Sequence, residues 1–192
     1  MDLDDPIALA LAIAEALRGE GLQHALYGGL LLAAYGEARE TRDVDIAVAH
    51  ADAAFAVRLL EAERGLETIP AFDRRAFGGL LISRITVVEG DALNMLDLVE
   101  PRDPAYAERA LGRAIESSLR DRPTHVLTAE DFVLFNLLST RDRDLADAES
   151  VTKNLGADLE RERIEIELER LAGTTPEHDI TARWRRVLAG GN

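Results

Sequence analysis

The chain has 192 residues, of which 47% are hydrophobic and 30% charged, and it contains no cysteine. This length suits one compact domain or a domain with a small helical annex. The lack of cysteine excludes disulfides, thiolate metal sites and a cysteine nucleophile. No run approaches the ~18 apolar residues of a membrane-spanning helix, and the acidic amino terminus is unlike a signal peptide. We therefore expect a cytoplasmic protein with no membrane partner.

The formal net charge of -14 narrows the range of partners. Such a charge repels polyanions, so strong generic binding to a nucleic acid backbone is not expected. Lys153 is the single lysine, which removes almost every candidate for a lysine-based site. Carboxylates, arginines, histidines or hydroxyls must carry the chemistry.

Hydrophobic periodicity predicts alternating helices and strands as far as residue 127. The expected helices cover residues 7–17, 30–35, 51–64 and 105–112. The expected strands cover residues 24–27, 44–49, 80–88, 92–99, 115–119 and 124–127, with a hairpin turn between the third and fourth. Helices and strands are thus interspersed in this half of the chain.

From residue 128 onward the pattern is helical almost to the end. Thr128, followed three positions later by Asp131, resembles an N-cap signature for a helix over 129–138. Further helices are expected over 141–153, 158–172 and 179–188. The predicted fold class is α+β: a mixed β-sheet core with flanking helices in residues 1–127, and a helical carboxy-terminal region in residues 128–192 that packs on it.

Two short motifs in the first half suggest a phosphate and metal site. Gly28 and Gly29 stand where a strand turns into a helix, which lets a ligand approach the backbone and the unpaired N–H groups of the helix. Asp43 and Asp45 alternate with apolar residues, so both carboxylates project from one face of a strand. Paired carboxylates of this kind are ligands for Mg²⁺, which also binds substrate phosphates.

Asp97 is a lone acid in an otherwise apolar strand and is the candidate for a third metal ligand. Each feature also has a plainer interpretation. The glycine pair can be an ordinary turn, and the two aspartates can lie on a solvated strand face. Asp97 can pair with Arg84 or another arginine. The combination of all three features in this order favours a functional site.

The residues resemble a known superfamily. Tyr27-Gly28-Gly29 and the run over 39–46 are similar to the signature of nucleotidyltransferases built on the DNA polymerase beta fold. The segments 130–138 and 141–147 resemble the carboxy-terminal motif of AbiEii-like nucleotidyltransferases, a group that includes toxins of toxin–antitoxin and phage-defence systems. The resemblance covers residues 22–151 and is not specific for a substrate.

The resemblance implies a Mg²⁺-dependent or Mn²⁺-dependent enzyme that moves a nucleoside monophosphate from a nucleoside triphosphate to an acceptor hydroxyl. Gly28 and Gly29 would hold the triphosphate. The catalytic and metal-binding acids would be Asp43, Asp45 and Asp97. The acceptor is open among a small molecule, a protein and RNA, and membership of the toxin group would add an antitoxin partner.

The main departure from the family pattern is Asn136, which stands where relatives carry a phosphate-contacting lysine. Arg143, seven positions on, can supply the missing charge if the helix continues. Arg39 and Arg42 precede the acidic strand and can contact phosphate or form salt bridges. The motif acids Asp144 and Asp147 are expected to pair with Arg141 or Arg143 as a structural feature.

Two other interpretations compete with an active transferase. In the first, the chain keeps the fold and binds nucleotide or metal, but acts as a catalytically impaired regulatory or interaction module; Asn136 favours this. In the second, the chain is a structural α/β domain and both motif matches are accidental.

Overall fold

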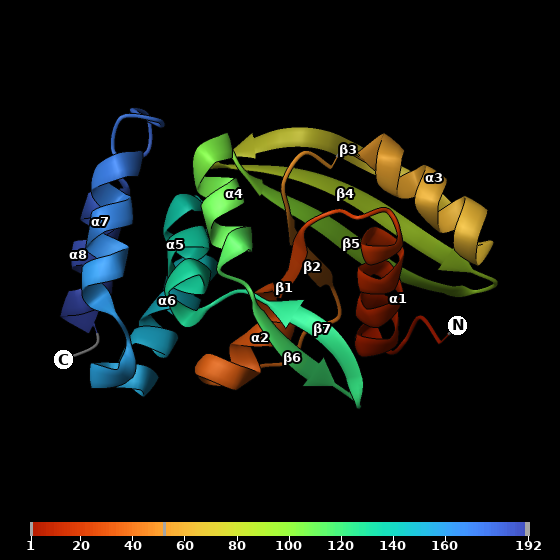
Figure 1. Ribbon diagram of the computed structural model, residues 1–192, viewed down its shortest axis with the longest axis horizontal. Coiled ribbons are helices and arrows are strands. Elements are labelled where there is room, and N and C mark those ends of the chain that lie inside the picture. The colour runs from red at the N-terminus through yellow and green to blue at the C-terminus, as the bar shows by residue number, and fades with distance from the viewer. Residues whose placement is uncertain (1, 52, 191–192) are drawn as a thin grey trace.

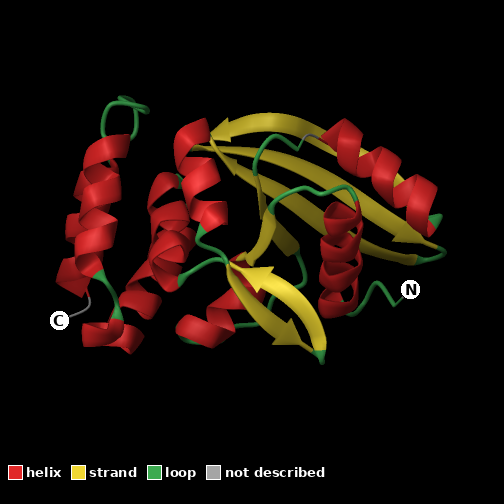
Figure 2. Cartoon of the chain, in the orientation of Figure 1, coloured by secondary structure: helices red, strands yellow, loops and turns green. Residues whose placement is uncertain are grey.

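The computed structural model describes residues 2–51 and 53–190 as one mixed sheet flanked by helices (Figures 1 and 2). The strands run in the spatial order β3-β4-β5-β2-β1-β7-β6. Their bounds are β1 His24–Tyr27, β2 Val44–Val48, β3 Glu67–Phe77, β4 Leu80–Glu89, β5 Ala92–Pro101, β6 Ile115–Leu119 and β7 Arg122–Val126. β2 is parallel to β5 and antiparallel to β1, so the predicted α+β class with a mixed sheet is confirmed.

Helices cover both faces of the sheet and continue into the carboxy-terminal part of the chain. Their bounds are α1 Pro6–Gly19, α2 Gly28–Tyr35, α3 Ala53–Arg64, α4 Pro104–Gly112, α5 Ala129–Leu138, α6 Asp142–Leu155, α7 Arg161–Leu171 and α8 Ile180–Gly190. One core lies between α1, α3 and the face of β2 that carries Val44 and Ile46. The other core joins the opposite face to α4, α5 and the helices after them; Figure 1 shows where these helices lie beside the sheet. Residues on both sides of position 127 contribute to this second core.

The strand and helix ends follow local sequence signals. The carboxylate of Asp5 accepts a hydrogen bond from the backbone N–H of Ile7, and Pro6 opens α1. The hydroxyl of Thr128 accepts from the backbone N–H of Asp131 at 3.1 Å, which confirms the expected N-cap of α5. The hairpin between β4 and β5 is also confirmed.

The main error of the sequence prediction is β3, for which no element was expected. This strand of 11 residues lies at the edge of the sheet, most of its side chains are exposed, and Pro70 interrupts it. An exposed edge strand lacks the alternation that marks a half-buried strand. The helix expected over 158–172 begins only at Arg161, because Gly156–Asp158 forms a short 3-10 turn. The helix expected from residue 51 is α3 from Ala53, and Asp52 lies outside the described residues, as do residues 1, 191 and 192.

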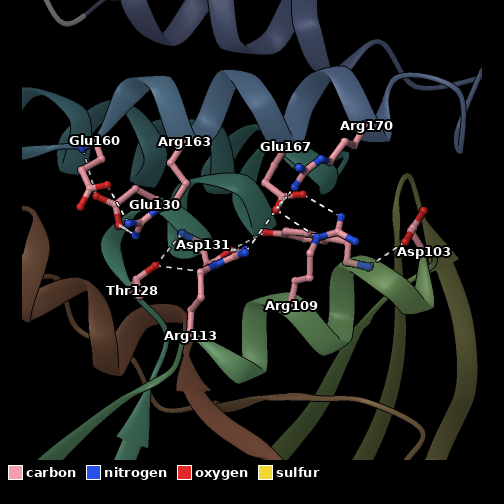
Figure 3. A network of polar contacts seen from close by, with 11 residues as sticks. Asp103, Arg109, Arg113, Thr128, Glu130, Asp131, Glu160, Arg163, Glu167 and Arg170 are labelled. Atoms are coloured by element: carbon pink, nitrogen blue, oxygen red, sulfur yellow. Dashed lines mark hydrogen bonds and ion pairs between the residues drawn. The ribbon is translucent and has the colours of Figure 1, made fainter.

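A network of ion pairs joins α7 to α4 and α5 (Figure 3). The buried carboxylate of Glu167 on α7 accepts hydrogen bonds from Arg109 at 3.1 and 2.7 Å and from Arg113 at 3.2 Å. Arg113 also donates to Asp131, which has 0% exposed surface, at 2.9 and 2.7 Å. Because these side chains come from three helices, the network ties the helical region to the core.

Across the described residues, no helix is both long enough and apolar enough to cross a membrane.

Candidate active site

Three charged side chains and two aromatic rings form a single row across five adjacent strands. Tyr27 lies opposite Asp45, and Asp45 opposite Asp97. Asp97 lies opposite Arg84, and Arg84 opposite Phe72. Residues directly opposite each other in a sheet project from the same face. The register therefore brings together acids that are 52 positions apart in sequence, at the centre of the sheet.

Gly28 and Gly29 are required by close backbone approach. A Cβ atom on Gly28 would lie 2.0 Å from Oδ2 of Asp45, and the backbone of Gly28 has a φ of +66°. A Cβ atom on Gly29 would lie 2.7 Å from the Cβ of Thr41. Glycine is the residue that fits both positions, since any larger side chain would displace the acidic strand or the loop before it. The first turn of α2 thus lies directly against Asp45.

Asp43 and Asp45 point their carboxylates into the same small cavity. Among the described residues neither carboxylate accepts a hydrogen bond or forms an ion pair, although both line one small cavity. Burial, the largest cause, and the neighbouring charge of Asp97 together raise the pKa of Asp45 to about 7, although Arg141 opposes the shift. A bound cation would offset the cost of ionising this buried carboxylate.

Asp97 differs from the other two acids because it is fully paired. Nε and Nη2 of Arg84 each donate to one carboxylate oxygen at 2.7 Å. The hydrogen bond to Asp97 raises the pKa of Arg84 above its ordinary value. This confirms the plainer interpretation of Asp97, that it pairs with Arg84. Within the parts of the chain that are described, no three histidines, aspartates or glutamates converge to hold a metal ion.

Arginine–aspartate pairs close the side of the cavity that faces α6. Arg39 donates to Asp147 at 3.2 and 2.8 Å, and Arg141 donates to Asp144 at 2.7 Å. Both aspartates are buried. The expected pairing with Arg141 is confirmed for Asp144, whereas Asp147 pairs with Arg39 rather than with Arg141 or Arg143. Arg141 was not among the predicted site residues, and its only signal in the sequence is its place three residues before Asp144.

Asn136 occupies a structural position in the wall of the cavity. Its Oδ1 accepts a hydrogen bond from the Tyr27 hydroxyl at 2.9 Å, and its Nδ2 donates to the carbonyl of Phe132 at 3.0 Å. The helix does not continue from Asn136 to Arg143, because α5 ends at Leu138 and α6 begins at Asp142. Arg143 nevertheless lines the same cavity from α6.

Most predicted site residues meet in this cavity, which has a volume of about 50 Å³. It is lined by Tyr27, Gly28, Arg39, Thr41, Asp43, Asp45, Asp97, Asn136, Arg141, Arg143, Asp144 and Asp147. Arg42 is not among them: its side chain is 86% exposed, lies 3.8 Å from Glu40, and lines a neighbouring groove of about 580 Å³. Thr41 and Asp43 border both the cavity and the groove. The cavity is too small for a substrate, and the adjoining groove provides that space beside the acids.

Comparison with known proteins places this geometry in context. No protein family model and no curated protein matches the chain. Among solved structures, the antibiotic-resistance factor ANT(2'')-Ia matches with a TM-score of 0.53 at 17% identity, over 88% of this chain and 94% of that one. The chain has a nucleotidyltransferase fold.

A candidate nucleotidyltransferase from H. pylori supports the same fold. It matches with a TM-score of 0.51 at 15% identity, over 90% of this chain and 80% of that one. At 17% and 15% sequence identity, these matches establish the fold of the chain and not its substrate or partner.

Proposed function

We propose that the chain is a Mg²⁺-dependent or Mn²⁺-dependent nucleotidyltransferase that moves a nucleoside monophosphate from a nucleoside triphosphate to an acceptor hydroxyl. The observation that carries this proposal is that Asp43 and Asp45 line one cavity with carboxylates that have no partner among the described residues, and that Asp45 lies directly against Gly28. The nucleotidyltransferase fold of the two structural relatives supports it.

The residues present fit a divalent cation at Asp43 and Asp45. Neither carboxylate has a hydrogen-bonding or ion-pair partner in the part of the chain that the structure describes, and hard oxygen ligands suit Mg²⁺. Bound there, the cation would neutralise phosphate charge and lower the pKa of an attacking hydroxyl. Asp97 would complete the acidic row, with Arg84 as its counterion. The backbone N–H groups at Gly28 and Gly29 would bind the triphosphate at the start of α2.

The cationic side chains around the cavity would bind the remaining phosphate charge. Arg143 lines the cavity and makes no ion pair among the described residues, so we assign it the role that a lysine has in relatives. Arg39 would contribute once it leaves Asp147, and Arg42 would act from the adjoining groove. Asn136 would contribute least, because its amide oxygen already accepts from Tyr27.

The acceptor and the biological role extend this proposal. We expect the groove beside Asp43 to receive the acceptor, whose hydroxyl belongs to a small molecule, a protein or RNA. A toxin or defence role with an antitoxin partner would use the same transfer reaction. Cytoplasmic location and the absence of strong generic nucleic acid binding remain expectations from the charge and composition.

A labelled-transfer assay tests the proposal. Each of the four nucleoside triphosphates, labelled at the α-phosphate, is incubated with the protein, Mg²⁺ and separate small-molecule, protein and RNA fractions. The label should appear on an acceptor together with free pyrophosphate, and an Asp43→Asn, Asp45→Asn variant should give neither. Nucleotide binding without transfer to any fraction would instead support the second candidate, a catalytically impaired module, which the structural position of Asn136 favours.

A further inference from the structure

Asp97, one of the three candidate metal-binding acids, is neutralised by the protein itself. We propose that the Arg84 guanidinium stands in place of a second divalent cation, so that Asp43 and Asp45 hold a single metal ion and Asp97 ligates none. The inference rests on the proposed function, since it concerns the metal content of the same site. It makes Arg84 a positioning residue that fixes the number of cations.

The contact between Arg84 and Asp97 uses the whole carboxylate. Nε and Nη2 donate to the two different oxygens, each at 2.7 Å, in the parallel fork that arginine forms with carboxylates. Asp97 borders the cavity but is only 1% exposed, and each of its oxygens already accepts a hydrogen bond from Arg84. A metal ion at Asp97 would have to share an oxygen with the Arg84 guanidinium, whose positive charge opposes a second cation there.

Three features hold Arg84 in this position. It lies directly opposite Asp97 in the antiparallel register of β4 and β5. Its guanidinium lies 5.8 Å from the ring centroid of Phe72, its opposite neighbour on β3. Its side chain is 27% exposed. Cross-strand pairing, an aromatic neighbour and partial burial all oppose displacement, so the pair is part of the sheet rather than a flexible surface contact.

The remaining charges match one divalent cation. Because Asp97 is paired with Arg84, the unpaired negative charge at this side of the cavity comes from Asp43, just before β2, and Asp45 in β2. Neither has a partner among the described residues. Their two negative charges equal the charge of a single Mg²⁺ or Mn²⁺. Among the described residues no set of three acidic or histidine side chains is arranged around one point, as a fuller metal site would require.

Arg84 also keeps donors for an anionic ligand. Its Nη1 makes no hydrogen bond within the described residues, whereas Nε and Nη2 point to Asp97. An arginine fixed by a carboxylate and carrying free N–H groups is well suited to a phosphate oxygen. Arg84 would therefore supply positive charge beside Asp97 without a second metal.

Manganese binding tests the proposal with two readouts, calorimetric stoichiometry and electron paramagnetic resonance. We expect wild type to bind one Mn²⁺ per chain with the spectrum of an isolated ion. In the Arg84→Met variant we expect two ions, close enough for spin coupling, since paired metal sites lie ~3.5–4 Å apart. Arg75→Met is the matched control: Arg75 lies 5.9 Å from the same Phe72 ring but does not contact Asp97, so this variant should bind one ion.

An Asp97→Asn variant keeps the proposal testable if Arg84→Met does not fold. Because Asp97 ligates no metal, this variant should still bind one Mn²⁺, with an affinity within about threefold of wild type. Two coupled ions in wild type, one ion in folded Arg84→Met, or loss of Mn²⁺ from folded Asp97→Asn would each overturn the proposal and leave the proposed function standing. Wild type that binds no Mn²⁺, with or without nucleotide, would contradict the proposed function as well.

Discussion

Replacing Gly28 by alanine tests the contact between the glycine turn and the acidic strand. The change has two costs. First, an L-residue with a φ of +66° is strained by about 1–2 kcal/mol. Alanine also makes the unfolded chain less flexible than glycine does, and this offsets about 0.4–1 kcal/mol of the strain. The new Cβ would also lie 2.0 Å from Oδ2 of Asp45 and 2.6 Å from its Cγ, so Asp45 must move. Overpacking of this kind costs about 1–3 kcal/mol more.

Gly21 provides a matched control. It has a φ of +71°, but a Cβ there would meet nothing within 4 Å. Gly21→Ala therefore carries only the strain, a net loss of about 0.5–1 kcal/mol, whereas Gly28→Ala should lose about 2–4 kcal/mol. At about 2–4 °C per kcal/mol for a chain of this size, the Tm of Gly28→Ala should fall by roughly 5–15 °C and that of Gly21→Ala by only a few degrees.

The two variants should also differ in metal binding. Displacement of the Asp45 carboxylate should weaken Mn²⁺ binding at least about tenfold in Gly28→Ala, which corresponds to about 1.4 kcal/mol, while Gly21→Ala should bind as wild type does. Thermal unfolding and calorimetry measure both effects. Equal losses of stability in the two variants, together with unchanged Mn²⁺ affinity, would refute the close approach of Gly28 to Asp45.

Three further changes follow from the site and its support. The pKa of Asp45 in the folded protein is raised to about 7, so its ionisation costs stability as the pH rises from about 4 to 7. Without metal, Asp45→Asn should therefore raise the free energy of unfolding by about 1–3 kcal/mol at pH 8 and change it little at pH 4. An equal gain at both pH values would contradict this. Glu167→Gln should cost about 2–3 kcal/mol in urea unfolding at pH 7, since the carboxylate is buried among partly exposed arginines. Burial opposes ionisation of Glu167, but the hydrogen bonds and charge of Arg109 lower its pKa overall, so the difference should disappear as the pH falls through the pKa of Glu167 in the folded protein. A loss that persists once Glu167 is protonated would argue against the ion pairs. Asn136→Ala should lower the free energy of unfolding by about 1–3 kcal/mol, because the Tyr27 hydroxyl loses its hydrogen-bond acceptor. The affinity for the Mg²⁺–nucleotide complex should stay within about twofold of wild type, and a tenfold loss of affinity would show that Asn136 contacts the nucleotide directly.

Local sequence signals predicted most of the elements. The glycine turn, the alternation around Asp45 and the cap at Thr128 are short-range patterns, and each lies in the element that was expected. Edge strand β3 was missed because its exposed side chains lack alternation.

The site itself depends on register, which local patterns do not encode. Arg84 was only one possible partner for Asp97, and its position opposite that acid emerges from the pairing of β4 and β5. Arg141 joins the cavity because the chain breaks between α5 and α6 and returns toward the sheet. Single motifs predicted which acids are candidates for the site, and the assembled sheet determines which of them pair with arginine.

Calorimetric titration of the four nucleoside triphosphates, with and without Mg²⁺, tests the central claim most directly. The titrations use wild type and the Asp43→Asn, Asp45→Asn variant, with circular dichroism to verify that both are folded. The account predicts Mg²⁺-dependent binding of at least one triphosphate by wild type and loss of that binding in the variant. Folded wild type that binds none of the four would contradict the account.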